Sequence, residues 1–213
     1  MRRFILTGAP GSGKTSILRI LAGRGYPVIA EAATDVIAAE QARGIGEPWQ
    51  DPAFIDKIIE LQRSRQLGQH SGGQHSGGQH SGGQPSLDQH SGGQPSLDQP
   101  GDGTGPVEFY DRSPVCTRAL ATFLGYQPTA ALRSELTRII EQSVYQRLVF
   151  FIRSIGFIEP TSARRISYDE SLRFEQIHEA IYARLNFRLI DVNPGTPEAR
   201  ADFICDRLSR RFD

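Results

Sequence analysis

The chain has 213 residues, of which 38% are hydrophobic, and its 24 basic and 24 acidic side chains leave no net charge. This length fits one domain with a full hydrophobic core, and the absence of net charge argues against binding to nucleic acid or anionic membranes through an overall field. Two widely spaced cysteines and the lack of a long apolar stretch exclude a disulfide framework and a membrane span, so we expect a cytoplasmic protein.

The first expected elements are a strand at residues 3–8 and a helix at 14–22, joined by "GAPGSGKT" at residues 8–15. That segment matches the phosphate-binding pattern G-x-x-x-x-G-K-[ST]. A glycine-rich turn can match by accident, but phosphate binding requires the position between a strand and a helix that this loop has. In such loops, backbone N–H groups point at phosphate oxygens, a lysine reaches the β and γ phosphates, and a hydroxyl ligates Mg²⁺.

We therefore expect ATP and Mg²⁺ to bind at this loop, with Lys14 as the lysine and Thr15 as the metal-binding hydroxyl. The residues expected to contact the nucleotide are Gly8, Ala9, Pro10, Gly11, Ser12, Gly13, Lys14, Thr15 and Ser16.

A second strand is expected at residues 26–31, and it ends in Glu31. Ligands of parallel sheets bind at the carboxyl ends of the strands, so this carboxylate should stand near the loop. There it could accept the proton of an attacking hydroxyl or hydrogen-bond a sugar or a base. The alternative is a solvated residue that precedes the helix expected at residues 32–43.

A helix is expected at residues 51–66, with Asp51 as its N-cap and Pro52 at its first position. This helix carries Gln62 and Arg63 near its end. Gln62 could read the edge of a base and Arg63 could bind a phosphate, although both could be ordinary surface residues.

Residues 67–106 form a low-complexity segment in which "QHSGG" and "QPSLD" units repeat. The segment has almost nothing apolar to bury, so it cannot offset the entropy lost on ordering. We expect it to be a disordered insertion within a single domain that spans residues 1–213. Four of the five histidines lie in it, which raises metal binding as an alternative, but one imidazole per flexible unit gives no preorganised site.

A third strand, at residues 107–111, ends in Asp111 and should neighbour the strand that precedes the loop. A carboxylate there can complete the shell of a magnesium ion or orient a nucleophile. A hydrolytic ATPase would have a glutamate next, but this chain has Arg112, which cannot act as a general base at pH 7 and can clamp an anion. The alternative is that Asp111 or Ser113 merely caps the helix that Pro114 begins.

The remaining pattern predicts strands at residues 147–154 and 187–192 and helices at 114–124, 129–145, 167–185 and 196–211. Five strands alternating with helices indicate an α/β P-loop NTPase fold, with a five-stranded parallel sheet flanked by helices in a kinase-like order. Before the helix at 167–185, "EPTSARRISYDES" carries Arg164 and Arg165. These arginines could close over the phosphates as a lid, or they could lie on an ordinary solvated helical face.

Five segments of the chain carry a family resemblance: "ILTGAPGSGKTSILRIL", "YPVIAEAATDVI", "IIELQRSRQ", "FYDRSP" and "YARLNFRLIDVNPGTPEARADFI". Together they resemble the NadR-like AAA-type P-loop family, which includes a ribosylnicotinamide kinase domain and many predicted ATPases and kinases. The resemblance covers essentially the whole chain outside the repeat. More distantly, the chain is similar to deoxynucleoside kinases, which have a glutamate after strand two, a glutamine on the substrate helix, an acid-Arg-Ser motif after strand three and an arginine lid.

The resemblance implies a role for each matching residue. Glu31 would be the base or ligand of the acceptor hydroxyl, Gln62 would lie near an acceptor base, and Asp111 would lie beside Mg²⁺. Arg112 would contact the acceptor or the phosphates, and Arg165, together with Arg164, would belong to the lid.

These inferences favour a phosphotransferase that moves the γ phosphate of ATP to a hydroxyl of a small-molecule acceptor such as a nucleoside. The alternative is an ATPase or nucleotide-dependent switch that acts on a protein partner. Zero net charge and the absence of a basic stripe argue against a nucleic-acid partner. Neither the identity of the acceptor nor the oligomeric state follows from the sequence.

Overall fold

The structure is a computed structural model that describes residues 1–68, 105–154 and 167–209. Most of the expected insertion, residues 69–104, lies outside these ranges, as do the expected lid residues Arg164 and Arg165.

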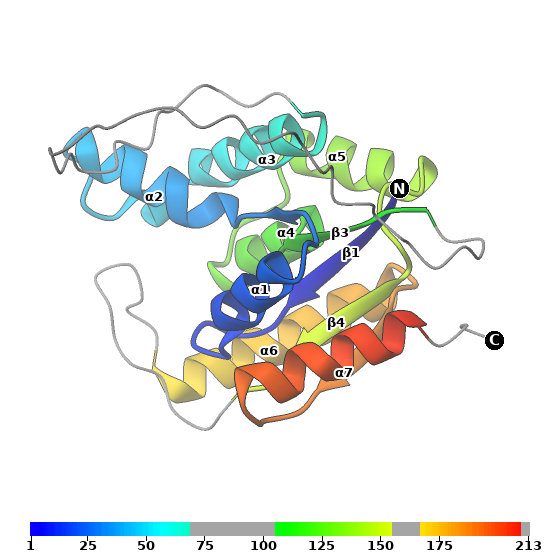
Figure 1. Cartoon of the computed structure of the whole chain (residues 1–213). Helices are drawn as coiled ribbons and strands as arrows, with labels where there is room; N and C mark the ends of the chain where they lie inside the picture. The colour runs from blue at the N-terminus through cyan, green and yellow to red at the C-terminus, as the bar shows by residue number, and fades with distance from the viewer. Residues whose placement is uncertain (69–104, 155–166, 210–213) are drawn as a thin grey trace, which may run out of the picture.

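Five strands and seven α-helices alternate along the described ranges (Figure 1). In chain order they are β1 (Arg2–Thr7), α1 (Lys14–Gly23), β2 (Val28–Ile29), α2 (Ala32–Ala42), α3 (Ala53–Gln66), β3 (Val107–Asp111), α4 (Pro114–Phe123), α5 (Ala130–Glu141), β4 (Leu148–Ile152), α6 (Tyr168–Arg184), β5 (Arg188–Val192) and α7 (Pro197–Ser209). The strands form one sheet in the order β2-β3-β1-β4-β5, and every neighbouring pair is parallel. The expected five-stranded parallel sheet flanked by helices is therefore confirmed.

The register of the sheet brings the ends of three strands to one edge. Leu6 of β1 lies opposite Asp111 of β3, and Ile29 of β2 lies opposite Tyr110. Because the strands are parallel, the segments that follow β1, β2 and β3 all leave the sheet at this edge. At this edge, therefore, the phosphate-binding loop lies next to Glu31 and Arg112.

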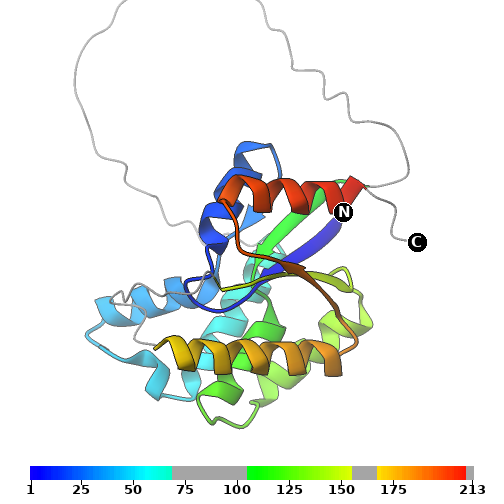
Figure 2. The same cartoon turned by 90° about the horizontal axis from the view of Figure 1, so that it is seen from below.

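Alternation along the strands divides the core into two layers. Phe4 and Leu6 of β1 pack toward α1 and α7, whereas Ile5 packs toward α4, α5 and α6. Figure 2 shows the sheet between these two groups of helices. Because both faces of the sheet are covered, the strand residues are mostly apolar, and in β4 all five are.

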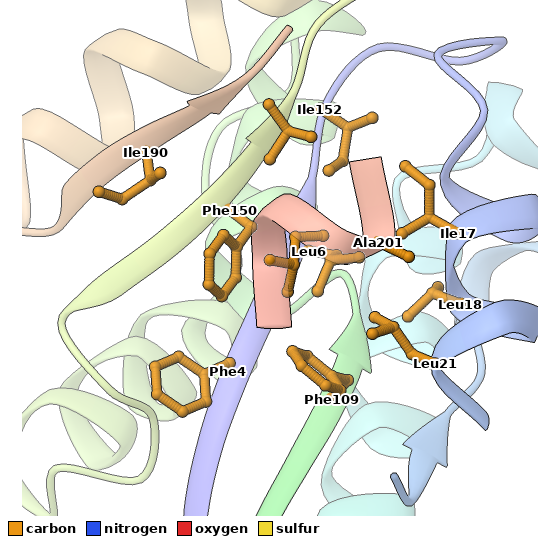
Figure 3. Packing of buried hydrophobic residues seen from close by; sticks show 12 residues of the cluster. Phe4, Leu6, Ile17, Leu18, Leu21, Phe109, Phe150, Ile152, Ile190 and Ala201 are labelled. Atoms are coloured by element: carbon orange, nitrogen blue, oxygen red, sulfur yellow. The ribbon is translucent and has the colours of Figure 1, made fainter. Parts of the chain in front are cut away.

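Aromatic rings fill the layer between the sheet and the pair α1 and α7 (Figure 3). The ring centroids of Phe4, Phe109 and Phe150 lie 5.9 to 6.4 Å apart in tilted pairs, within the range that aromatic pairs prefer. Each of these side chains is at most 1% exposed, so together they anchor the three central strands beneath the loop.

Helices α2 and α3 pack against each other through Ala32, Val36, Phe54 and Ile58, and α3 also contacts α4. No helix among the described residues is both long and apolar enough to span a bilayer.

Several boundaries differ from the expected ones. α3 begins at Ala53 with Pro52 as its N-cap residue, so the expected N-cap at Asp51 is wrong. Two further differences have identifiable reasons. β2 is shorter than residues 26–31 because it lies at the sheet edge and because the Tyr26 N–H donates to Leu21 O of α1 instead. α5 ends at Glu141 rather than at residue 145, and Ser143 just beyond it has a φ of +48°, which a continuing helix does not allow.

Candidate functional site

A cavity of about 570 Å³ opens at the carboxyl edge of the sheet, next to the phosphate-binding loop. Its polar lining residues include Lys14, Thr15, Ser16, Glu31, Gln62, Asp111 and Arg112. Its apolar lining residues include Ile37, Trp49, Phe54, Ile58, Leu120, Phe123 and Phe174, from α2, α3, α4, α6 and the turn before α3. The cavity thus joins a phosphate-binding end to a recess with aromatic walls.

The loop needs its glycines for two physical reasons. Gly8, Gly11 and Gly13 have φ values of 139°, 80° and 86°, in the region that residues with a Cβ rarely adopt. A Cβ on Gly8 would also lie 2.2 Å from Ile152 O of β4, closer than any real contact. The tight turn between β1 and α1 therefore requires glycine at these positions.

Lys14 is buried beneath the loop that precedes it. Its Nζ donates to Gly8 O at 3.1 Å, to Ala9 O at 2.8 Å and to Ser12 Oγ at 3.3 Å. Burial and the neighbouring charge of Arg112 lower the pKa of Lys14 to about 7. A phosphate at this position would favour the charged ammonium, because an adjacent anion raises a lysine pKa.

Glu31 and Arg112 form an ion pair on the cavity wall, with Arg112 Nε 2.5 Å from Glu31 Oε1. Thr34 Oγ1 donates to the other oxygen of Glu31 at 3.0 Å. Burial opposes ionisation of Glu31, but the charges of Arg112 and Lys14 outweigh it and lower the pKa of this carboxyl. Glu31 is therefore a carboxylate at neutral pH.

The backbone of Arg112 is itself strained. Its φ of +72° lies in the left-handed region, which is uncommon for a residue other than glycine, and its N–H donates to Leu6 O at 3.0 Å. Such strain persists only where the surrounding structure enforces it, and it concentrates at functional sites. Here it turns the chain at the end of β3.

His178 of α6 contacts the guanidinium of Arg112. Its Nδ1 lies 2.8 Å from Phe174 O, so that nitrogen is the donor, and Nε2 lies 3.4 Å from Arg112 Nη1 and can accept. Burial and the charge of Arg112 lower the pKa of His178 to about 3, so the ring is neutral. The sequence reasoning missed this residue, although it is the one histidine outside the repeat.

Asp111 and Thr15 both line the cavity beside the loop and supply oxygen donors. Mg²⁺ prefers oxygen ligands and usually takes one or two protein oxygens together with phosphate oxygens and water. Within the described part of the chain no three His, Cys, Asp or Glu side chains gather as a metal site. This pair of donors fits Mg²⁺ bound jointly with a nucleotide rather than by the protein alone.

The two candidate residues on α3 lie in different places. Gln62 lines the cavity, and its Oε1 accepts from Thr117 Oγ1 at 3.0 Å. Arg63 is 54% exposed, lies 4.0 Å from Glu135 Oε2 of α5, and does not line the cavity. The structure therefore brings Gln62, and not Arg63, to the other candidate residues.

Ser113 takes the N-cap position of α4 without a capping side-chain hydrogen bond. Its hydroxyl lies 3.0 Å from the hydroxyl of Tyr182 instead. The alternative in which Ser113 caps the helix that Pro114 begins is therefore confirmed for its position, although the side chain makes no capping hydrogen bond.

A model of the AAA domain family matches residues 3–75 and 98–200 of the chain. A search of curated proteins found no significant match. Solved structures of deoxyadenosine kinase from M. mycoides match in fold, with a TM-score of 0.54 and 12% identity for the one with the products dCMP and dCDP, covering 97% of each chain. The same kinase with bound dATP matches at 0.51 and 13% over 98% of this chain and 100% of that one, and with bound dCTP at 0.54 and 13% over 98% of each.

Proposed function

The chain belongs to the AAA domain family, and from that premise we propose that it moves the γ-phosphoryl group of ATP to a hydroxyl of a nucleoside-like or other small acceptor. One observation carries the proposal. A single cavity joins the phosphate-binding loop to the Glu31–Arg112 ion pair and to an apolar recess. A hydrolytic ATPase needs a base for water at this place, and it does not need a recess for an organic acceptor.

The loop and Lys14 hold the phosphates of the donor. Backbone N–H groups at the start of α1 favour anionic oxygens, and Lys14 exchanges its contacts with Gly8 O and Ala9 O for phosphate oxygens. Bound Mg²⁺, held by Thr15 and Asp111, would supply charge neutralisation on the phosphates.

Glu31 receives the acceptor hydroxyl. Its carboxylate is ionised and faces the cavity, so it can hydrogen-bond the hydroxyl and take its proton as the new bond forms. Its low basicity suits a loose transition state, in which the hydroxyl loses its proton late. Arg112 lies beside it, where its charge can stabilise the transferring group or an anionic acceptor.

The recess supports an acceptor with a flat apolar part. Trp49, Phe54, Phe123 and Phe174 line it, and Gln62 adds a hydrogen-bonding group at its wall. Aromatic walls with few polar groups suit a planar ring system. That the similar M. mycoides kinase binds dATP and dCTP supports a nucleoside-like acceptor.

Two parts of the proposal rest on the sequence. Arg164 and Arg165, outside the described residues, are proposed to close over the phosphates. A cytoplasmic location belongs to the same proposal and is supported by two cysteines that are both free.

The experiment is an ADP-release assay of the full chain with ATP and Mg²⁺, with and without a panel of nucleosides and other small alcohols. Turnover that depends on one acceptor class supports the phosphotransferase. Slow ADP release that no acceptor accelerates would contradict it and would favour the ATPase or switch that acts on a protein partner.

A further inference from the structure

Arg200 is a buried arginine directly behind the phosphate-binding loop. It lies in the first turn of α7 and is 4% exposed. Its Nη1 donates to Ser12 O at 2.7 Å, and its Nη2 donates to Arg153 O at 2.8 Å and to Val192 O at 3.3 Å. The guanidinium thus ties the loop to the ends of β4 and β5.

The charge of Arg200 has no compensating carboxylate within the part of the chain that the structure describes. All three of its acceptors are backbone carbonyls, and its Nε is buried without a hydrogen-bond partner. Burial lowers the pKa of this guanidinium, with no acidic group acting in the opposite direction. A buried cation without a counter-charge is costly to the folded state.

Arg153 accepts a hydrogen bond from Arg200 through its carbonyl oxygen, and its own charge, unlike that of Arg200, is compensated by carboxylates. Its guanidinium pairs with Glu175 at 2.7 Å, with Asp191 at 2.8 Å and with Glu179. The fold therefore surrounds one arginine at this edge with three carboxylates and leaves its neighbour with none. An uncompensated positive charge in this position suits an anion that comes from outside the chain.

The geometry of one peptide unit connects Arg200 to the place where phosphates would bind. Ser12 C=O and Gly13 N–H belong to the same trans peptide, so they point in opposite directions. Since Arg200 binds the carbonyl, Gly13 N–H points away from it. Donation to the carbonyl polarises the peptide and strengthens that N–H as a donor. A Cβ on Gly13 would lie 3.2 Å from Arg200 Nη1, which shows how closely the guanidinium backs the loop.

We infer that Arg200 is a positioning residue whose buried charge is compensated by the polyphosphate of the nucleotide, so that it strengthens polyphosphate binding through the Ser12–Gly13 peptide. The inference rests on the nucleotide-binding part of the proposed function and is independent of the acceptor. If Arg200 only held the loop in place through hydrogen bonds, any hydrogen-bond donor would serve at this position. The inference requires its positive charge as well.

Two variants of the full chain separate charge from hydrogen bonding. Arg200→Lys keeps the charge and loses the forked donor, whereas Arg200→Gln keeps a donor for Ser12 O and loses the charge. Titration calorimetry with inorganic tripolyphosphate and with MgATP measures the affinity of each. Arg19→Met, an exposed arginine on α1, is the matched control for loss of one positive charge near the loop.

Arg200→Lys is expected to bind tripolyphosphate within a few-fold of the wild type, and Arg200→Gln about tenfold or more weakly, a difference of about 1.4 kcal/mol. Arg19→Met should bind like the wild type. Equal affinity in both Arg200 variants, whether unchanged or equally weakened, would overturn the inference. If Arg200→Gln does not fold, as judged by circular dichroism, Arg200→Asn, which is also uncharged and keeps an amide donor, takes its place.

Failure of the inference can be told apart from failure of the proposed function. A wild type that binds neither tripolyphosphate nor MgATP refutes the proposed function and the inference together. A wild type that binds both, with Arg200→Gln binding equally well, refutes the inference alone.

Discussion

Arg112 Nε lies 2.5 Å from Glu31 Oε1 on the wall of a cavity that also contains Lys14. The two residues are 81 positions apart in the sequence, and the parallel register of β2 and β3 brings them together. The pair keeps Glu31 ionised, so a carboxylate lies beside the phosphate-binding loop, where we propose that the acceptor hydroxyl binds.

Removing the carboxylate tests whether Glu31 takes part in the chemistry. Glu31→Gln is expected to reduce acceptor-dependent turnover by about 10²- to 10⁴-fold, the usual effect of losing a general base. ATP affinity should be unchanged or higher, because Arg112 loses its carboxylate partner. Steady-state kinetics and calorimetry measure the two effects. Glu141→Gln, at the exposed end of α5, is the matched control, and equal turnover in both variants would contradict the assignment.

Gly8→Ala tests whether the loop requires a residue without a Cβ at this position. The added Cβ would meet Ile152 O at 2.2 Å at a φ of +139°, so we expect a loss of roughly 2 to 4 kcal/mol in the free energy of unfolding. Gly23→Ala has nothing within 4 Å and no positive φ, and should be neutral or stabilising by up to about 1 kcal/mol. Urea unfolding compares the two, and a Gly8→Ala variant as stable as wild type would show that the loop is looser than described.

The buried histidine predicts a pH dependence of stability. The folded-state pKa of His178 is about 3, below its ordinary 6.5, so between these values the unfolded chain binds a proton that the folded chain does not. Stability should therefore fall as the pH drops below about 6.5, by at most about 1.4 kcal/mol per pH unit from this group. Urea unfolding at several pH values should show a shallower dependence for His178→Gln, and parallel curves for the two proteins would contradict the prediction.

Lys14 predicts proton uptake on nucleotide binding. Its pKa of about 7 in the ligand-free chain makes it mostly neutral at alkaline pH, and a bound polyphosphate favours the charged form. At pH 8.5, MgATP binding should take up close to one proton, and at pH 6 close to none. Calorimetry in buffers of different ionisation enthalpy measures this number. The guanidinium in Lys14→Arg does not titrate. If this variant still takes up a proton on binding MgATP, a group other than Lys14 binds that proton and the prediction is wrong.

Some parts of the site could be predicted because their signals are local. The loop lies between a strand and a helix that are each recognisable alone, and Asp111 ends a strand that Arg112 directly follows. The family match and the P-loop kinase-like fold confirm the resemblance drawn from these segments. Gln62 could also have been separated from Arg63, because it lies four residues after Ile58, which shares its helical face and also lines the cavity.

Other parts depend on contacts that no local pattern encodes. Arg200 reaches Ser12 across 188 positions, and His178 reaches Arg112 across 66. In the sequence, Arg200 has the appearance of an ordinary helix residue, and His178 that of a satisfied core histidine. Their contacts follow from the packing of α7 against the loop and the ends of β4 and β5, and from the packing of α6 beside Arg112, which are set by tertiary structure.

The central claim is that the γ-phosphoryl group goes to an organic hydroxyl and not to water. Phosphorus NMR of a reaction of the full chain with MgATP and the acceptor that most accelerates ADP release follows the γ-phosphorus directly. We predict a growing phosphate-ester signal in step with ADP, strongly reduced in Glu31→Gln. A spectrum in which the γ-phosphorus appears only as inorganic phosphate, at the same rate with and without every acceptor, would contradict the account.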